Sequence, residues 1–175
     1  MRARSAKLPD AFAIEQLIQV HVGDGTLLPR SLSEICENIR DFIVVENEDE
    51  IVGCGALHLY GLHLAEIRSI TVTRESKGKG AGRVLIDALL KEGERQSVTC
   101  VCLFTRIPDF FARMGFQVVE KEALPDKLLK DCMKCQRRNA CDEIAMYMGT
   151  LPEVARHSRR PRAAQEYVQI APQHA

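Results

Sequence analysis

Glycines and basic residues alternate over positions 77–83, and this pattern suits ligand binding better than any other segment. The residues are Lys77, Gly78, Lys79, Gly80, Ala81, Gly82 and Arg83. Glycines let the backbone turn tightly and approach a ligand closely. A strand is predicted before the segment and a helix after it, so backbone N–H groups and the positive end of the helix dipole point at one place. The pattern predicts an anion-binding loop.

Two familiar phosphate-binding motifs do not fit this glycine segment. The Gly-Lys-Ser/Thr ending of a P-loop is missing, and the glycine spacing of a dinucleotide-binding fingerprint is also absent. An exposed glycine-rich turn with solvated lysines is the alternative to an anion site. The predicted strand before the segment and the helix after it favour the anion site.

The cysteines suggest a second kind of chemistry, because Cys132, Cys135 and Cys141 are closely spaced. Structural zinc takes four ligands, and only three are local here. A fourth would have to come from Cys36, Cys54, His58 or His63 by tertiary contact. We therefore predict no metal and favour reduced packing or loop thiols, with metal and redox roles as alternatives. Seven cysteines in all fit a reducing, cytoplasmic location better than a disulfide framework.

Hydrophobic periodicity outlines the scaffold that positions these groups. Strands are predicted at 2–7, 42–46, 51–59, 66–72, 98–104, 116–119 and 143–148. Helices are predicted from Pro9 to about 22, at 31–40, 80–96 and 108–114, and within 124–142. In the strand 66–72, strict alternation places Glu66, Arg68, Ile70 and Val72 on one face. Because strands alternate with helices only in the middle of the chain, we predict an α/β fold with a mixed sheet.

The bulk composition limits the partners. The 175 residues carry 24 Lys+Arg and 24 Asp+Glu, for a formal net charge of zero, which argues against nucleic acid and anionic membranes. No apolar run is long enough to cross a bilayer, and the N-terminus does not resemble a signal peptide. We predict one domain over 1–150 and a disordered basic tail over 151–175. A small molecule is the expected partner, and a homodimer is an open alternative.

Two segments together resemble the GNAT acetyltransferases. That family's loop pattern, Gln/Arg-x-x-Gly-x-Gly/Ala, is similar to this chain from Lys77 to Gly82, with lysine where glutamine or arginine is usual. The later stretch 110–116, Phe-Phe-Ala-Arg-Met-Gly-Phe, resembles the family's Phe-Tyr-x-x-x-Gly-Phe segment. The resemblance implies a mostly antiparallel sheet of six to seven strands flanked by helices. It also implies that acetyl-CoA, as co-substrate, lies between two splayed parallel central strands.

Residues 1–149 further resemble the acetyltransferase part of N-acetylglutamate synthases, especially their short single-domain relatives. The landmarks are Leu28-Pro29-Arg30-Ser31, Gly53–Leu57, Ala65–Ser69, Thr105-Arg106, Leu124-Pro125 and Asp131-Cys132-x-x-Cys135. The resemblance implies acetyl transfer to the α-amino group of a free amino acid, glutamate first, in arginine biosynthesis. The amino-acid kinase domain through which arginine inhibits longer synthases has no counterpart in this sequence, so we expect no inhibition by that route.

The resemblance assigns roles to particular residues. The pantetheine arm of acetyl-CoA is expected along the backbone of Ile70, Thr71 and Val72, and its pyrophosphate in the loop 77–83. Glu66 matches the position of the base that deprotonates the ammonium of the acceptor, directly or through water. A solvated or salt-bridged carboxylate is the alternative for Glu66.

The general acid is left open, because Phe111 stands where many members of the family have tyrosine. A phenyl ring cannot donate a proton to the departing thiolate. The thiolate then leaves unprotonated, or water, Thr105 or Tyr147 serves as the donor.

Three arginines are candidates to bind the acceptor, because a guanidinium binds carboxylates bidentately. Arg30 and Arg106 match the family's substrate arginines by motif, and Arg68 is expected near the same end of the sheet. Taken singly, each could be a surface salt-bridge partner. Two rival functions remain: a GNAT that acetylates another small amine or a protein amine, and a non-catalytic acetyl-CoA sensor.

Overall fold

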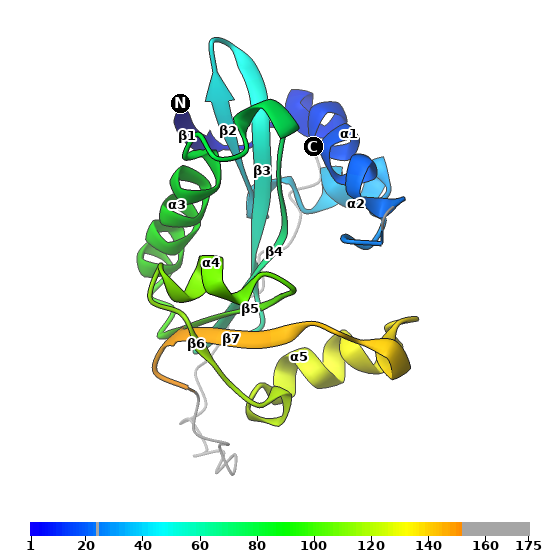
Figure 1. Ribbon diagram of the computed structural model, residues 1–175, viewed down its shortest axis with the longest axis vertical. Coiled ribbons are helices and arrows are strands. Elements are labelled where there is room, and N and C mark those ends of the chain that lie inside the picture. Colours follow the sequence, from blue (N-terminus) through cyan, green and yellow to red (C-terminus); the bar gives the residue numbers. More distant parts are fainter. Residues whose placement is uncertain (24, 152–175) are drawn as a thin grey trace, which may run out of the picture.

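The computed structural model describes residues 1–23 and 25–151 and shows one seven-stranded sheet with helices on both faces (Figure 1). The strands are β1 (Arg2–Ser5), β2 (Phe42–Asn47), β3 (Glu50–Leu59), β4 (Leu64–Val72), β5 (Cys100–Thr105), β6 (Gln117–Val118) and β7 (Ile144–Gly149). The helices are α1 (Ala11–Val22), α2 (Leu32–Glu37), α3 (Ala81–Arg95), α4 (Pro108–Ala112) and α5 (Pro125–Lys130). Short 3-10 helices span Leu8–Asp10, Ile39–Asp41, Arg74–Ser76, Lys121–Ala123, Cys132–Lys134 and Arg138–Ala140.

The two faces of the sheet carry separate hydrophobic cores. Successive strand side chains point to opposite faces, and β2 shows this clearly. Ile43 and Val45 pack with the α3 residues Leu85 and Leu89, whereas Val44 packs with α1 and α2. Figure 1 shows α3 on one side of the sheet and α1 and α2 on the other. The helix predicted at 80–96 from hydrophobic periodicity is confirmed as α3, and it packs on the sheet through these apolar residues.

The centre of the sheet holds its one parallel pair of strands. The strand order is β1-β2-β3-β4-β5-β7-β6, and among the described strands only β4 and β5 pair in parallel. Their pairing covers Leu64 with Cys100, Ala65 with Val101, and Glu66 with Cys102. Beyond Glu66, β4 continues to Val72 without pairing to β5. The predicted mixed, mostly antiparallel sheet is confirmed, and its two parallel strands separate directly after Glu66.

A β-bulge interrupts β4 where that separation begins. Ala56 of β3 pairs with Arg68 and Cys54 pairs with Thr71, so two β4 residues lie opposite Gly55 alone. Ser69, the first of the two, has φ +54°, in the left-handed region that few side chains adopt. The strict alternation predicted over 66–72 is therefore wrong beyond Arg68, because a bulge adds one residue to the strand and re-aims those that follow.

The α2 helix begins as the sequence predicted. The Ser31 hydroxyl accepts a hydrogen bond from the backbone N–H of Glu34 at 3.2 Å, as an N-cap residue does. The carboxylate of Glu34 binds Arg30. The helix end thus orients an arginine that the sequence had singled out.

Two predictions concern the whole chain. The basic tail predicted over 151–175 lies, apart from Leu151, outside the described residues. In the part of the chain that the structure describes, no helix combines the length and apolar character needed to span a membrane.

Candidate active site

The glycine loop forms the N-terminal end of α3. Gly78 and Gly80 have φ +78° and +92°, and a Cβ atom added at either glycine would meet no heavy atom within 4 Å. Gly80 is the N-cap of α3 and supplies no side-chain cap, so the first N–H groups of a 15-residue helix are left for another acceptor. Lys77 and Lys79 are exposed beside it. Glycine freedom, open space, helix dipole and positive charge all fit the phosphate-bearing ligand predicted here.

The part of β4 beyond Ser69, the first bulge residue, leads to this loop. Ile70, Thr71 and Val72 lie on it, and its pairing with β5 has already ended. Among residues 1–23 and 25–151, the buried Thr71 hydroxyl is the side-chain polar atom that has no hydrogen-bond partner. Buried polar groups are normally satisfied. This donor and the backbone beside it therefore fit an extended ligand that lies along β4.

The α4 helix lies against the glycine loop where the loop enters α3. A Cβ atom at Gly82 would lie 3.4 Å from the ring of Phe110. Phe111 is buried, with its ring in edge contact with Phe110 and Phe116. Phe111 is thus a core residue, and its phenyl ring has no proton to donate to the reacting groups.

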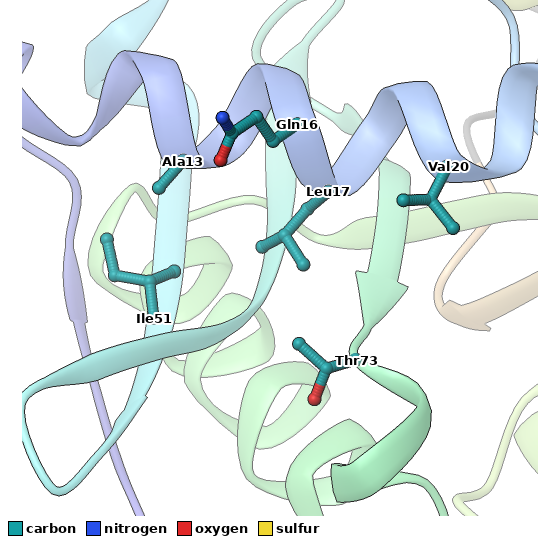
Figure 2. A pocket seen from close by; sticks show the side chains of 6 residues that line it. All are labelled: Ala13, Gln16, Leu17, Val20, Ile51 and Thr73. Carbon is teal, nitrogen blue, oxygen red and sulfur yellow. The ribbon is translucent and has the colours of Figure 1, made fainter.

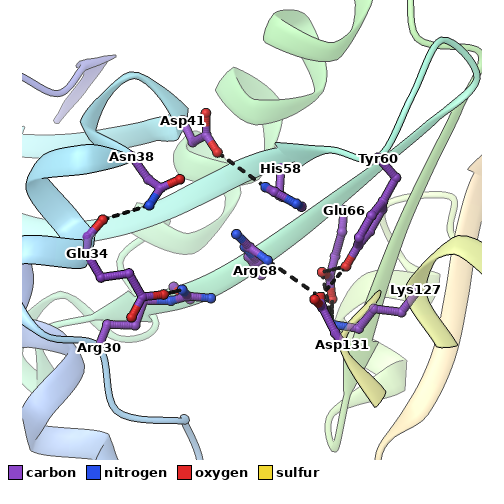
Figure 3. A network of polar contacts seen from close by, with 11 residues as sticks. Arg30, Glu34, Asn38, Asp41, His58, Tyr60, Glu66, Arg68, Lys127 and Asp131 are labelled. Carbon is purple, nitrogen blue, oxygen red and sulfur yellow. Dashed lines mark hydrogen bonds and ion pairs between the residues drawn. The ribbon is translucent and has the colours of Figure 1, made fainter. Parts of the chain in front are cut away.

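Glu66 is the centre of a buried polar cluster (Figure 3). Its side chain is 3% exposed, and it is the last β4 residue paired with β5. The Lys127 ammonium lies 2.7 Å from Oε1 and 3.0 Å from Oε2, and the Tyr60 hydroxyl lies 2.7 Å from Oε2. The solvated alternative for Glu66 is therefore wrong, and the salt-bridged alternative describes its contacts.

Asp131 closes the cluster on its outer side. Its Oδ2 atom binds the Tyr60 hydroxyl, lies 3.1 Å from the Lys127 ammonium, and lies 3.5 Å from the Arg68 guanidinium. The Asp131 side chain is 33% exposed, far more than Glu66. The cluster therefore runs from a buried carboxylate to one that reaches solvent, with two cations balancing two anions.

The cluster fixes the protonation of its members. Burial and the neighbouring Glu66 carboxylate raise the pKa of Tyr60, which therefore remains a neutral hydroxyl. Burial lowers the pKa of Lys127, but the charges and hydrogen bonds of Glu66 and Asp131 together outweigh burial, and the net change is upward. Burial raises the pKa of Asp131, but the Tyr60 hydrogen bond and Lys127 outweigh it, and the net change is downward. Lys127 therefore stays charged and Asp131 stays ionised at neutral pH.

Two of the three predicted arginines lie at the β4 bulge. The Nε atom of Arg30 donates to the Ser69 hydroxyl at 2.8 Å, and Arg68 reaches Asp131 beside it. Figure 3 shows both guanidinium groups on the same side of the sheet as the Glu66 cluster. The structure therefore brings Arg30, Arg68 and Glu66 to one region.

The recorded partners of Arg106 lie outside this group. It binds Asp142 through Nε at 2.8 Å and donates to the Gly25 carbonyl at 3.0 Å. Arg137 donates to the same carbonyl. Arg106 thus contacts the connection between α1 and α2, which leads on to Arg30.

The sequence analysis missed Tyr60, Lys127 and Asp131 as site residues. Lys127 and Asp131 are four residues apart, a spacing that places two side chains on the same side of a helix. This spacing was the available signal. Nothing in the local sequence marked Tyr60, which follows β3 and reaches Glu66 across the β3–β4 connection.

The cysteines fall into two groups. Cys54, Cys100 and Cys102 are buried as predicted, and burial raises the pKa of Cys54 to about 12 and of Cys100 to about 11, so these thiols stay protonated. Cys141 is exposed and accepts a hydrogen bond from Lys121 at 3.2 Å. In residues 1–23 and 25–151, no three His, Cys, Asp or Glu side chains are arranged to hold a metal ion.

A shallow depression between α1 and the sheet lies apart from the polar cluster. It has a volume of about 240 Å³, and Figure 2 shows the six lining side chains. They are Ala13, Gln16, Leu17, Val20, Ile51 and Thr73. Because none of them titrates near neutral pH, the depression cannot supply acid–base chemistry.

Comparison with known proteins identifies the relatives of this chain. A family model described as "Acetyltransferase (GNAT) domain" matches residues 38–118. An uncharacterized N-acetyltransferase of Chlorobaculum tepidum is 42% identical over 82% of this chain and 92% of its own length. An amino-acid acetyltransferase of Mycobacterium tuberculosis is 36% identical over 67% of this chain and 68% of its own length.

Among solved structures, Rv2747 of Mycobacterium tuberculosis, in complex with CoA and NLQ, superimposes with a TM-score of 0.74. It is 28% identical, and the match covers 86% of this chain and all of that one.

Proposed function

The chain belongs to the GNAT family of acetyltransferases, with acetyl-CoA as co-substrate, and we propose that it acetylates the α-amino group of L-glutamate. The products are N-acetylglutamate and CoA. One observation carries the proposal: the buried Glu66 carboxylate lies where β4 and β5 part, on the same side of the sheet as Arg30 and Arg68. A candidate base and two guanidinium groups that can bind carboxylates thus lie at one end of β4, the strand expected to hold the thioester.

The reaction transfers an acetyl group from sulfur to nitrogen. The acceptor ammonium first loses a proton to Glu66, directly or through a water, because only the neutral amine is nucleophilic. Its nitrogen then attacks the thioester carbonyl, and the C–S bond breaks as the tetrahedral intermediate collapses. A backbone N–H near Ile70, the second bulge residue, is the proposed donor to the developing oxyanion.

The binding of acetyl-CoA is proposed to use two parts of the chain. Backbone groups of Ile70, Thr71 and Val72 hold the pantetheine arm, and residues 77–83 at the start of α3 hold the pyrophosphate. Open space at Gly78 and Gly80 supports this assignment, because phosphate oxygens can approach the backbone there.

The specificity for glutamate rests on the arginines. Glutamate carries two carboxylates, and Arg30, Arg68 and Arg106 each bind a carboxylate of this chain: Glu34, Asp131 and Asp142 respectively. Each guanidinium is thus oriented by an anion that the acceptor carboxylate can join or replace. The amino-acid acetyltransferase among the relatives supports an amino-acid acceptor. Arginine biosynthesis in the cytoplasm is the proposed setting.

The test measures release of free CoA thiol from acetyl-CoA with each of the twenty amino acids. The protein's seven cysteines are subtracted as background. We expect turnover with glutamate well above the rest. Preference for another amine would keep acetyl transfer and reject glutamate, whereas acetyl-CoA binding without turnover on any amine would indicate a sensor.

The role of Glu66 is tested by Glu66→Gln, which keeps the side chain's size and removes the base. We expect kcat to fall about 10²- to 10⁴-fold, the usual contribution of a general base. Glu94→Gln makes the same change on the exposed C-terminal part of α3 and is the matched control. Unchanged kcat in Glu66→Gln would remove Glu66 from the reaction.

A further inference from the structure

The proposed reaction releases one proton in every turnover, and the inference below rests on that proposed function. An ammonium has three N–H bonds and the amide product has one, so two protons leave the nitrogen. One ends on the CoA thiol, and the other must reach solvent. A base that receives the second proton therefore needs a path to water before it can act again.

Glu66 has no direct path of its own in this structure. Its side chain is 3% exposed, and within the described part of the chain its hydrogen-bonding partners are Lys127 and Tyr60. Lys127 already carries its proton. Burial lowers its pKa, but the charges and hydrogen bonds of Glu66 and Asp131 together outweigh burial and raise the pKa. An ammonium has three donors and no acceptor, so it cannot take a proton from Glu66. The Tyr60 hydroxyl can accept one proton and donate another.

The Tyr60 hydroxyl lies between the two carboxylates of the cluster. It is 2.7 Å from Oε2 of Glu66 and forms its second hydrogen bond to Oδ2 of Asp131. Asp131 is 33% exposed, so the path from Glu66 to solvent needs only one intervening group. We propose that Tyr60 relays the proton from Glu66 to Asp131, which then releases it to water.

The relay is balanced in atoms and charge. Protonated Glu66 donates through Oε2 to the Tyr60 oxygen, while the Tyr60 O–H bond breaks and its proton moves to Oδ2 of Asp131. Asp131 gives that proton to solvent and returns to its anionic form. Tyr60 is neutral before and after, and Glu66 is again a carboxylate.

Basic groups hold the three relay residues in place. The Lys127 ammonium bridges Glu66 at 2.7 Å and Asp131 at 3.1 Å. Arg68 lies 3.5 Å from Asp131, and the Lys130 ammonium donates to the Tyr60 backbone carbonyl at 2.8 Å. The buried Cys102 thiol, opposite Glu66 on β5, is kept protonated by burial, which raises its pKa. The relay thus links β4, the end of β3 and the α5 segment.

The test measures full steady-state kinetics of Tyr60→Phe beside the unmodified protein. For Tyr60→Phe we expect kcat to fall at least about tenfold, with both KM values unchanged within about twofold, because proton transfer is impaired and binding is not.

A double-mutant cycle with Asp131→Asn tests whether the two groups share one path. If Tyr60 and Asp131 share one proton path, either single substitution interrupts that path. The double variant Tyr60→Phe/Asp131→Asn then lowers kcat no more than the more impaired single variant. Independent, multiplying effects would overturn the relay, as would a Tyr60→Phe kcat within about twofold of the unmodified protein. If Tyr60→Phe fails to fold, Asp131→Asn tests the relay instead. The relay requires that Asp131→Asn lowers kcat and leaves both KM values unchanged.

Glu66→Gln separates failure of the relay from failure of the proposed reaction. Loss of turnover in Glu66→Gln together with full activity in Tyr60→Phe rejects the relay and keeps the base. Full activity in Glu66→Gln rejects both, because there is then no proton on Glu66 to relay.

Discussion

The Lys127 ammonium binds both oxygens of the Glu66 carboxylate, at 2.7 Å and 3.0 Å, across 61 positions of sequence. Lys127 comes from α5 and Glu66 from β4, so the pair connects the C-terminal part of the described chain to the central strands. Both side chains are largely buried, at 14% and 3% exposure. Losing either partner would leave the other as an unpaired charge inside the protein.

Replacement of Lys127 by methionine should destabilise the fold. The buried Glu66 carboxylate loses its cation, and breaking a buried ion pair costs about 3–5 kcal/mol. Chemical denaturation at neutral pH measures the change in free energy of unfolding. Adding Glu66→Gln should recover part of the loss, because the uncompensated charge is then gone.

Lys91→Met on the exposed side of α3 controls for the loss of a lysine. We expect Lys91→Met to change the free energy of unfolding by less than about 0.5 kcal/mol, as surface substitutions usually do. Equal effects of the two lysine substitutions would show that the ion pair contributes nothing to stability.

Arg30→Ala should weaken binding of the acceptor and leave acetyl-CoA binding unchanged. The Arg30 guanidinium is bound to Ser69 at the bulge and to Glu34, on the side of the sheet proposed for the acceptor. Loss of a charged hydrogen bond to a carboxylate corresponds to roughly a tenfold or larger rise in acceptor KM. Arg95→Ala, on an arginine paired with Glu92 and 71% exposed, is the control. An unchanged acceptor KM would place Arg30 outside the site.

Gly80→Ala should raise the KM for acetyl-CoA without changing that for the acceptor. Gly80 has φ +92°, which strains any L side chain by about 1–2 kcal/mol, and its methyl group would occupy space proposed for the pyrophosphate. We expect a rise of about tenfold or more, equal to about 1.4 kcal/mol of binding. Gly61→Ala adds a methyl at an exposed glycine with no neighbour within 4 Å and no positive φ. If both variants bind acetyl-CoA equally well, the loop does not hold the pyrophosphate.

The ion pair of Arg4 and Asp10 should make stability depend on pH. Arg4 donates to both carboxylate oxygens of Asp10, at 2.7 Å and 3.0 Å, and this hydrogen bonding holds the pKa of Asp10 below its usual 3.8. For a carboxyl whose pKa is lowered on folding, the stabilisation is complete above the unfolded value and is lost as pH falls through the folded value. Asp10→Asn should therefore cost roughly 1–2 kcal/mol at pH 7. Thermal unfolding should show that the difference in stability between the unmodified protein and Asp10→Asn becomes smaller below pH 4. If that difference stays constant down to pH 2, the ion pair does not cause the pH dependence.

The sequence predicted the elements well because most of them are determined locally. Periodic apolar residues marked α1, α2 and α3, and they also marked β2 and β3, the two strands of the first hairpin. The glycine loop was equally visible, since the freedom of Gly78 and Gly80 is a property of the residues themselves. Strand alternation failed at Ser69, because a bulge depends on which residue of the neighbouring strand lies opposite.

Residue types and spacing by themselves determined the α/β fold class and the place of the glycine loop before a helix, and the family resemblance singled out Glu66 as a candidate base. Tertiary structure alone decided that Glu66 is buried, that Tyr60 and Lys127 bind it, and that Asp131 extends the cluster to solvent. These contacts join residues 6 to 71 positions apart. The local sequence carries periodicity and backbone preference. Charge pairing across the fold depends instead on which surfaces the packing of sheet and helices brings together.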